Sequence, residues 1–266
     1  MSSSPASTLP ETPPPKPALE MERVTVTTLH DPTKSVLEDV NWTVNAGDFW
    51  AVAGLLRSGK SDLMALASGI MRSGQGICRV FGEELFASFE QDQLALRLRV
   101  GLVFDGGQLL HQLTLAENIA LPLHYHWGHL DFDLGPRLKM LQAFTGIESW
   151  MQELPNSVTR NWQQRIGLAR ALALKPELVL LDSPLTGLDP RDTAWWVETI
   201  SALAAGHPVL DDRPATVIVT GDNLRPWAGR ATHFALLKDR RFVPLGTRAE
   251  LAGHQEPLLR ELLTDR

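Results

Sequence analysis

The chain has few of the residues that mark several common protein classes. Cys78 is the only cysteine among 266 residues, so a disulfide framework or a cysteine metal cluster is excluded and a reducing compartment is favoured. No apolar run reaches the length of a membrane span. The N-terminus also has neither the basic nor the apolar region of a secretion signal. These absences predict a protein of the cytoplasm.

The chain also lacks an excess of basic residues, since 31 Asp and Glu outnumber 25 Lys and Arg and the formal net charge is −6. This acidic balance argues against a nucleic-acid partner. With 44% apolar and 21% charged residues, the composition is that of a globular protein with ample material for a core. Residues 1–18 are rich in proline and serine and have little to bury, so we predict a disordered tail there and a folded domain over 19–266.

Short apolar or alternating runs predict the strands. They lie at 21–28, 36–44, 49–53, 100–104, 178–181 and 217–219. Helical spacing occurs between them, as at Leu138, Leu141 and Phe144. Strands that alternate with helices indicate an α/β protein with βαβ units. The stretch from about 107 to 160 is predicted to be a helical subdomain.

The segment Gly54 to Ser61, GLLRSGKS, fits the phosphate-loop pattern GxxxxGK[ST] at every fixed position. Glycines let the backbone turn tightly, and successive N–H groups then cradle phosphate oxygens at a helix N-terminus. Lys60 would reach the β- and γ-phosphates, and the Ser61 hydroxyl would hold Mg²⁺. The predicted nucleotide-binding residues are Gly54, Arg57, Ser58, Gly59, Lys60, Ser61 and Asp62.

A second nucleotide signal is the run LVLLDS, which ends in Asp182 and Ser183. An acid at the carboxyl end of a buried strand can bind the Mg²⁺ of a phosphate-loop protein. Asp182 is therefore the predicted second Mg²⁺ ligand, although alone it could be an ordinary turn residue.

From about residue 20 to its end, the chain resembles the ATP-binding subunit of an ABC transporter. The resemblance rests on GLLRSGKS, VGLVF, LTLAENIALPL, QQRIGLARALALKPELVLLDSPLTGLDP and TVIVTGD in this order. It implies a P-loop NTPase core with a mostly parallel sheet, an N-terminal antiparallel β portion and a helical subdomain. It also implies ATP and Mg²⁺ as ligands, head-to-tail pairing with a second nucleotide-binding subunit, and a membrane permease as partner. The chain would then lie on the inner face of a membrane.

Several motifs depart from the family pattern. The Gln, the catalytic Glu and the switch His of the family correspond to Asp105, Ser183 and Gly221. Arg57 and Asp62 replace a usual Gly and Thr in and after the loop. The LSGGQ signature corresponds to Val158, Thr159, Arg160, Asn161 and Trp162. By the resemblance, Thr159, Arg160, Asn161 and Asp189 would face the dimer interface.

The departures predict impaired hydrolysis. Loss of a general base slows a reaction by roughly 10²–10⁴, and three catalytic positions are altered. Binding is less affected, because Lys60, Ser61 and Asp182 remain. We therefore expect an ATP-binding subunit, paired with itself or with an active paralogue.

Two other interpretations stay open at this point: a scaffold that uses no nucleotide, and, less favoured, a phosphate-loop kinase or GTPase. The run from Phe104 to Leu123 resembles Mla-type lipid-trafficking ATPases, and it is also similar to the corresponding run of amino-acid importers. His124, His126 and His129 are a weaker metal candidate, since i, i+2 spacing does not share a helix face.

Overall fold

The computed structural model describes residues 16–86, 90–127, 133–146, 148–251, 253–254 and 256–263. Most of the predicted tail, residues 1–15, lies outside these ranges, as does His129. Within them the strands form a six-stranded and a four-stranded sheet. Ala18, which the sequence placed in the tail, is buried, and its N–H donates to Val44 O at 2.8 Å.

The six-stranded sheet has the order β10-β9-β3-β8-β7-β6. All neighbouring pairs are parallel except β9 with β10, which confirms the predicted α/β class with a mostly parallel sheet. Its strands are β3 (Phe49–Gly54), β6 (Val100–Val103), β7 (Leu178–Leu181), β8 (Thr216–Gly221), β9 (His233–Lys238) and β10 (Arg241–Thr247).

The second sheet is antiparallel, with the order β2-β1-β4-β5. It corresponds to the N-terminal β portion that the resemblance implied. Its strands are β1 (Leu19–Thr28), β2 (Asp31–Val44), β4 (Gln75–Val80) and β5 (Glu83–Glu84). Four strands were not predicted from the sequence, namely β4, β5, β9 and β10.

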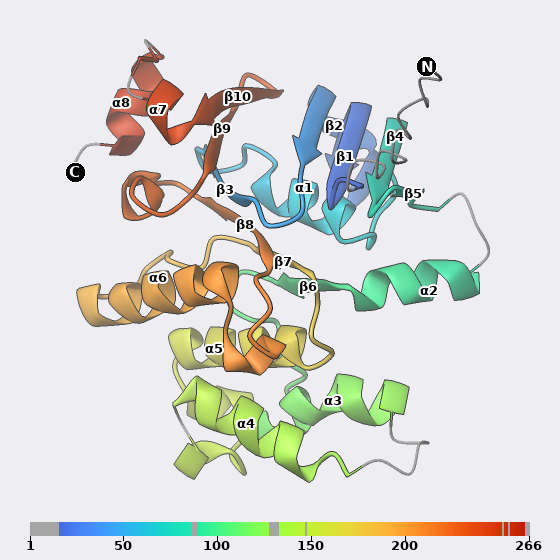
Figure 1. Ribbon diagram of the computed structural model, residues 1–266, viewed down its shortest axis with the longest axis vertical. Coiled ribbons are helices and arrows are strands. Elements are labelled where there is room, and N and C mark those ends of the chain that lie inside the picture. Colours follow the sequence, from blue (N-terminus) through green and yellow to red (C-terminus); the bar gives the residue numbers. More distant parts are fainter. Residues whose placement is uncertain are drawn as a thin grey trace, which may run out of the picture.

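Some helices pack against the parallel sheet, and others form a separate layer farther from it. Figure 1 shows α5 and α6 beside the sheet and α3 and α4 at the foot of the molecule. The α-helices are α1 (Lys60–Ala67), α2 (Glu90–Leu98), α3 (Leu115–Trp127), α4 (Gly135–Thr145), α5 (Arg160–Leu172), α6 (Pro190–Ala205), α7 (Arg248–Leu251) and α8 (Pro257–Leu263). Short 3-10 turns are η1 (Glu148–Trp150), η2 (Pro155–Ser157), η3 (Pro208–Leu210) and η4 (Arg225–Trp227). In the described part of the chain, none of the helices is long and apolar enough to cross a membrane.

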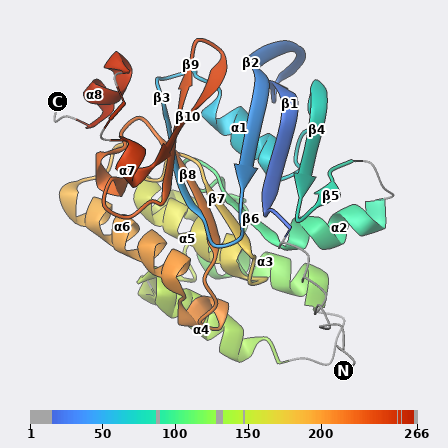
Figure 2. The same ribbon diagram turned by 45° about the horizontal axis from the view of Figure 1, so that its top comes forward.

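Alternate side chains of the central strands pack into two different hydrophobic cores, one on each face of the parallel sheet. On β3, Phe49, Ala51 and Ala53 join the core under α5 and α6. Trp50 and Val52 point the other way, into the core that α1 shares with the antiparallel sheet. Figure 2 shows α1 between β3 and the antiparallel strands. Because both faces of the parallel sheet are covered, its strands read as continuous apolar runs.

Candidate functional site

The phosphate loop connects β3 to α1 and depends on its two fixed glycines. Gly59 is the residue before α1 and has a φ of 91°, a left-handed conformation that glycine adopts without strain. A Cβ on Gly54 would lie 2.3 Å from Ser58 Oγ. The loop therefore has this shape only because both positions lack a side chain.

The Lys60 side chain folds back onto the backbone of the loop. Its Nζ donates to the carbonyl oxygens of Gly54 at 2.6 Å and Leu55 at 2.9 Å. Burial lowers the pKa of Lys60, and the carboxylates of Asp182 and Asp222 oppose this shift. The ammonium group thus lies over the loop backbone, in reach of the place where the loop would hold phosphate.

Arg57 and Asp62, the two residues of the loop region that depart from the family pattern, are charged and line the site. Arg57 has a φ of 64°, so it occupies a left-handed position at which an L-residue costs about 1–2 kcal/mol. This strain agrees with the glycine that the family uses here. Asp62 Oδ1 accepts from Leu29 N at 2.9 Å, so the turn between β1 and β2 holds this carboxylate.

A pocket of about 230 Å³ adjoins the loop. It brings together six of the seven predicted nucleotide-binding residues, all but Gly54, with Asp105 and Ser183. The lining residues are Leu56, Arg57, Ser58, Gly59, Lys60, Ser61, Asp62, Asp105, Ser183, Thr186 and Asp222. The pocket lies at the carboxyl ends of β3, β6, β7 and β8, where open α/β sheets bind ligands. Sequence reasoning missed Leu56, Thr186 and Asp222, although Asp222 directly follows the apolar strand β8.

Asp182 directly precedes Ser183 of this pocket and has an exposed fraction of 2%. Its Oδ1 accepts from Thr220 Oγ1 at 2.9 Å and from Ser183 Oγ at 3.3 Å. Among the described residues, no three His, Cys, Asp or Glu side chains gather as a metal site. The Ser61 hydroxyl and one carboxylate fit Mg²⁺ only together with ligand phosphates, which is the usual way that Mg²⁺ is held.

The altered catalytic positions offer no general base of the family's type. Ser183 has a hydroxyl in place of a carboxylate, and its backbone N–H donates to Thr220 Oγ1 at 3.1 Å. Gly221, the last residue of β8, has no side chain. The described residues that line the pocket include neither glutamate nor histidine. Asp105 supplies a carboxylate in this region, and Arg160 forms an ion pair with it.

The signature residues differ in their exposure within the chain. Thr159 and Arg160 are exposed at the start of α5. Asn161 is only 7% exposed, and its Oδ1 accepts from Trp196 Nε1 at 2.9 Å. Asn161 therefore joins α5 to α6 inside the chain, and its contact with a second subunit stays a prediction.

Asp189 has a structural role that its motif did not reveal. Its Oδ1 accepts from the N–H groups of Arg191 at 2.8 Å and Asp192 at 2.9 Å. It is thus the N-cap of α6, a position that favours aspartate. The residue remains exposed, so capping leaves room for a contact across a dimer.

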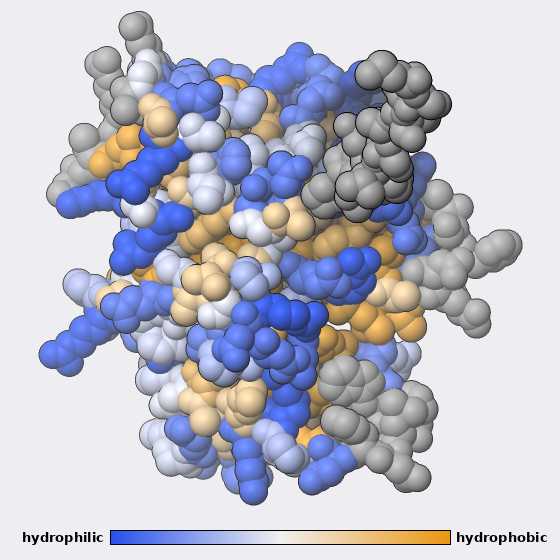
Figure 3. All heavy atoms as spheres, viewed as in Figure 1, coloured by the Kyte–Doolittle hydropathy of each residue, from blue (hydrophilic) through white to orange (hydrophobic). Residues whose placement is uncertain are grey.

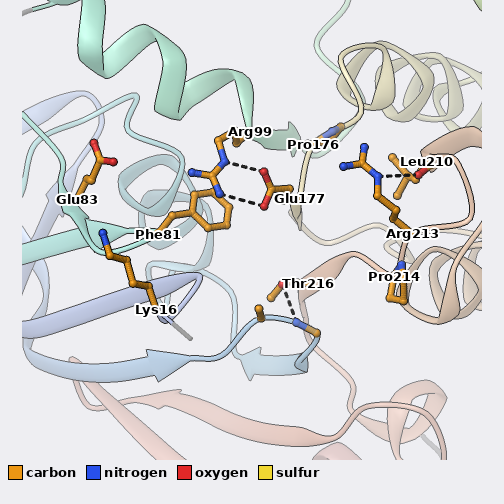
Figure 4. Close-up of a pocket in the computed structure, with 12 residues that line it drawn as sticks. Lys16, Phe81, Glu83, Arg99, Pro176, Glu177, Leu210, Arg213, Pro214 and Thr216 are labelled. Atoms are coloured by element: carbon orange, nitrogen blue, oxygen red, sulfur yellow. Dashed lines mark hydrogen bonds and ion pairs between the residues drawn. The ribbon is translucent and has the colours of Figure 1, made fainter. Parts of the chain in front are cut away.

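A second pocket, of about 500 Å³, lies at the opposite ends of the strands (Figure 4). Arg99 and Glu177, which precede β6 and β7, form a two-pronged ion pair there with distances of 2.7 and 3.0 Å. The Arg99 guanidinium also lies 3.7 Å from the centre of the Phe81 ring. These contacts join the antiparallel sheet to the core, on the side away from the phosphate loop.

The geometry of the phosphate loop agrees with the comparison with known families. The family described as ABC transporter matches residues 37–186, which is more than half of the chain. The chain belongs to the ABC transporter family. The matching domain is the ATP-binding domain of this family, because the similar curated proteins are named ATP-binding proteins.

Curated relatives support this assignment. The chain is 27% identical over 231 residues to the "probable ribonucleotide transport ATP-binding protein mkl" of Mycobacterium tuberculosis, covering 87% of this chain and 63% of that protein. It is 32% identical over 214 residues to the "methionine import ATP-binding protein MetN" of Rhizobium johnstonii, covering 80% of this chain and 57% of that protein. The chain thus spans less than two thirds of the length of these relatives.

Solved structures share the fold. A dimeric ATP-binding cassette, MJ0796, bound to ADP and Pi, has a TM-score of 0.73 and 22% identity, with 84% of this chain and 95% of that chain covered. The cbiO1 protein of Clostridium perfringens, part of the ABC transporter complex cbiONQ, has a TM-score of 0.72 and 19% identity, with 91% and 92% covered. These likenesses confirm the architecture of the cassette.

Proposed function

We propose that this chain is an ATP-binding subunit of an ABC transporter that couples nucleotide binding to a membrane partner and is impaired in hydrolysis. The observation that carries the proposal is the pocket at the phosphate loop. Lys60 and Ser61 are in place there, whereas Asp105, Ser183 and Gly221 stand where the family has its catalytic side chains. ATP and Mg²⁺ are the proposed ligands, with Ser61 and Asp182 as the residues that would hold Mg²⁺.

An apolar groove is the proposed contact for the membrane partner. It has a volume of about 510 Å³ and includes Leu98, Val100, Leu110, Leu121 and Tyr125. Figure 3 shows apolar surface between the positions of α2 and α3. An exposed groove of this kind fits an amphipathic helix, such as a cytoplasmic helix of a permease. The cbiO1 neighbour belongs to a transporter complex, which supports this type of partner.

One short segment links the groove to the nucleotide pocket. Asp105 lines the pocket and Leu110 lines the groove. Arg170 holds the backbone between them, since its Nη2 donates to the carbonyls of Gly107 at 2.8 Å and Gln108 at 3.0 Å. Asn118 donates to Leu110 O at 3.0 Å. A change at the pocket can therefore reach the groove through packed backbone.

The proposal includes a location and a second subunit. A subunit that binds a permease in this way would lie peripherally on the inner face of the cytoplasmic membrane. The second nucleotide-binding subunit would be another copy or an active paralogue. The transported substrate is a separate question. The names of the two relatives mention ribonucleotide transport and methionine import. The resemblance to Mla-type lipid-trafficking ATPases stays a prediction.

Nucleotide binding is tested by thermal unfolding with Mg-ATP, comparing the native chain with Lys60→Ala. A ligand at about 100 times its Kd stabilises by roughly 2.7 kcal/mol. For a domain near this size, that raises Tm by roughly 5–10 °C. We expect this shift in the native chain and its loss in Lys60→Ala. A cooperative native melt without any shift would contradict nucleotide use.

That last outcome would favour a second function, a scaffold that keeps the fold without using nucleotide. The strained Arg57 and the carboxylate of Asp62 in the pocket support it, because both make the loop a poorer phosphate site. The two functions therefore give opposite results in the same titration.

The groove is tested by Leu121→Glu. Leu121 is 40% exposed, so the change should leave the fold intact. A charge buried in an apolar contact weakens it by about tenfold or more. We expect the tagged native chain to retain a permease during purification from detergent-solubilised native membranes, and Leu121→Glu to lose it. Leu29→Glu, at a site that is 45% exposed and outside the groove, is the control. Equal recovery with both variants would exclude the groove as the contact.

A further inference from the structure

The pocket of about 500 Å³ on the side away from the phosphate loop has no part in the proposed function. Its volume lies in the range of sites for small organic molecules. Figure 4 shows that its walls come from separate parts of the chain. They belong to the connection of β4 with β5, to the segments before β6 and β7, and to the loop between α6 and β8. A ligand in this pocket would therefore contact both sheets of the domain.

Most carboxylates around this pocket are already paired with a cation. Glu177 accepts two hydrogen bonds from Arg99, and these lower the pKa of Glu177. Asp211 pairs with Lys175 at 2.7 Å, which lowers the pKa of Asp211. The pKa of Arg99 is raised by its bond to Glu177 and, to a smaller degree, by the charge of Glu83. The negative charges thus act mainly on Arg99 and Lys175.

Arg213 lines the same pocket and keeps unused donors. Its Nε donates to Leu210 O at 3.4 Å, a long contact, and within the described part of the chain its two Nη groups have no hydrogen-bond partner. The charge of Arg213 adds to the pKa shifts of Glu177 and Asp211, but it forms no ion pair with either. The free fork of a guanidinium matches the paired oxygens of a carboxylate or phosphoryl group.

The loop before Arg213 is strained and firmly held. Asp211 and Asp212 both have a φ of 57°, in the left-handed region that L-residues adopt only at a cost. The loop is fixed from below by Arg137, whose Nη1 donates to Val209 O at 2.7 Å. Such strain persists where the surrounding structure imposes it, and it often marks ligand sites. The position of Arg213 is thus set before any ligand binds.

The rest of the lining is largely apolar. Pro176, Pro214 and Leu210 lie near Arg213, and Phe81 lies across the pocket under the Arg99 guanidinium. A Cβ added to Gly47, which also lines the pocket, would meet nothing within 4 Å. Open space therefore adjoins these apolar walls. A ligand that fits has an apolar body as well as a negative charge.

We propose that this pocket is a second ligand site, which binds a small organic anion. The carboxylate or phosphoryl group of the ligand pairs with Arg213, and its apolar body lies against Pro176 and Pro214. The site is separate from the nucleotide pocket, because the two lie at opposite ends of the same strands. Binding here therefore does not need the phosphate loop.

The test is a titration of the ¹⁵N-labelled full chain, followed by NMR. The probes are benzoate and phenyl phosphate, which share an apolar ring and differ in the anion. We expect the backbone amide of Gly47 and the Nε–H of Arg213 to shift, with a Kd of roughly 1 mM for at least one probe. Benzyl alcohol keeps the ring without the charge, and inorganic phosphate keeps the charge without the ring. Each should bind at least about tenfold more weakly than the better probe.

Three variants locate the binding. Arg213→Gln should weaken it by about tenfold or more, because the charge-assisted hydrogen bonds are lost. Arg191→Gln is the matched control, since Arg191 is also exposed and lies outside the pocket, and it should bind as the native chain does. Lys60→Ala should also bind normally, which separates this site from the phosphate loop. The dispersion of each spectrum confirms that the variants fold.

Several outcomes would overturn the inference. They are the absence of any shift at about 10 mM of both probes, equal binding by benzyl alcohol or inorganic phosphate, unchanged binding in Arg213→Gln, and loss of binding in Lys60→Ala. The relative affinity of the two probes tells whether the natural ligand carries a carboxylate or a phosphoryl group. The proposed function is judged separately, by the Mg-ATP titration.

Discussion

Arg137→Met is expected to lower the stability of the domain by about 3–5 kcal/mol. The Arg137 side chain is buried and donates to three backbone carbonyls, those of Ala173 at 3.2 Å, Val209 at 2.7 Å and Leu172 at 2.5 Å. Leu172 ends α5, so the guanidinium caps this helix and ties α4 and η3 to it. Each carbonyl that loses its donor costs about 1–3 kcal/mol.

Part of this loss is offset. Burial lowers the pKa of Arg137, with Asp211 opposing the shift, so folding already carries a desolvation penalty that methionine would remove. The remaining loss corresponds to a Tm decrease of roughly 10 °C for a domain near this size. Methionine keeps the apolar stem, so the change reports on the hydrogen bonds. Arg191→Met, at an exposed site, should alter Tm little. If both variants melted alike, the capping role of Arg137 would be wrong.

The sequence predicted strands well where both faces of the sheet are covered. The runs at β3, β7 and β8 are apolar because side chains on both faces are buried, and such runs stand out in a sequence. The hairpin of β9 and β10 was missed for a physical reason. Its turn residues Asp239 and Arg240 have φ values of 48° and 60°, where Asn-Gly or Asp-Gly would be the usual signal.

The phosphate loop could be predicted because its chemistry is contiguous in the chain. The signature region could not, because helix rotation decides which of two neighbours faces inward. Asn161, Gln164, Arg165 and Leu168 follow the i, i+3, i+4, i+7 pattern and are all buried, so they form the inner face of α5. Arg160 lies one position earlier and points outward, to Asp105. Matching residues to a motif treats Arg160 and Asn161 alike, whereas the helical period makes one exposed and the other buried.

The second large effect is expected for Gly107→Ala, in the segment that joins the nucleotide pocket to the groove. Gly107 has a φ of 77°, and a Cβ there would lie 2.4 Å from Gln163 O and 3.0 Å from Gln164 Cα. The left-handed backbone costs about 1–2 kcal/mol, and the overlap with α5 adds about 1–3 kcal/mol. We expect Tm to fall by roughly 5–15 °C.

Gly187→Ala separates these two contributions. Gly187 has a φ of 72° with nothing within 4 Å of an added Cβ, so this variant should lose only the backbone share of about 1–2 kcal/mol. The overlap in Gly107→Ala can be relieved only if the segment moves away from α5, which would shift Asp105 and Leu110 together. Gly107→Ala should therefore weaken both the Mg-ATP shift and permease retention, whereas Gly187→Ala should leave retention intact. Equal melting of the two variants would mean that α5 does not hold the segment, and the proposed route between pocket and groove would fail with it.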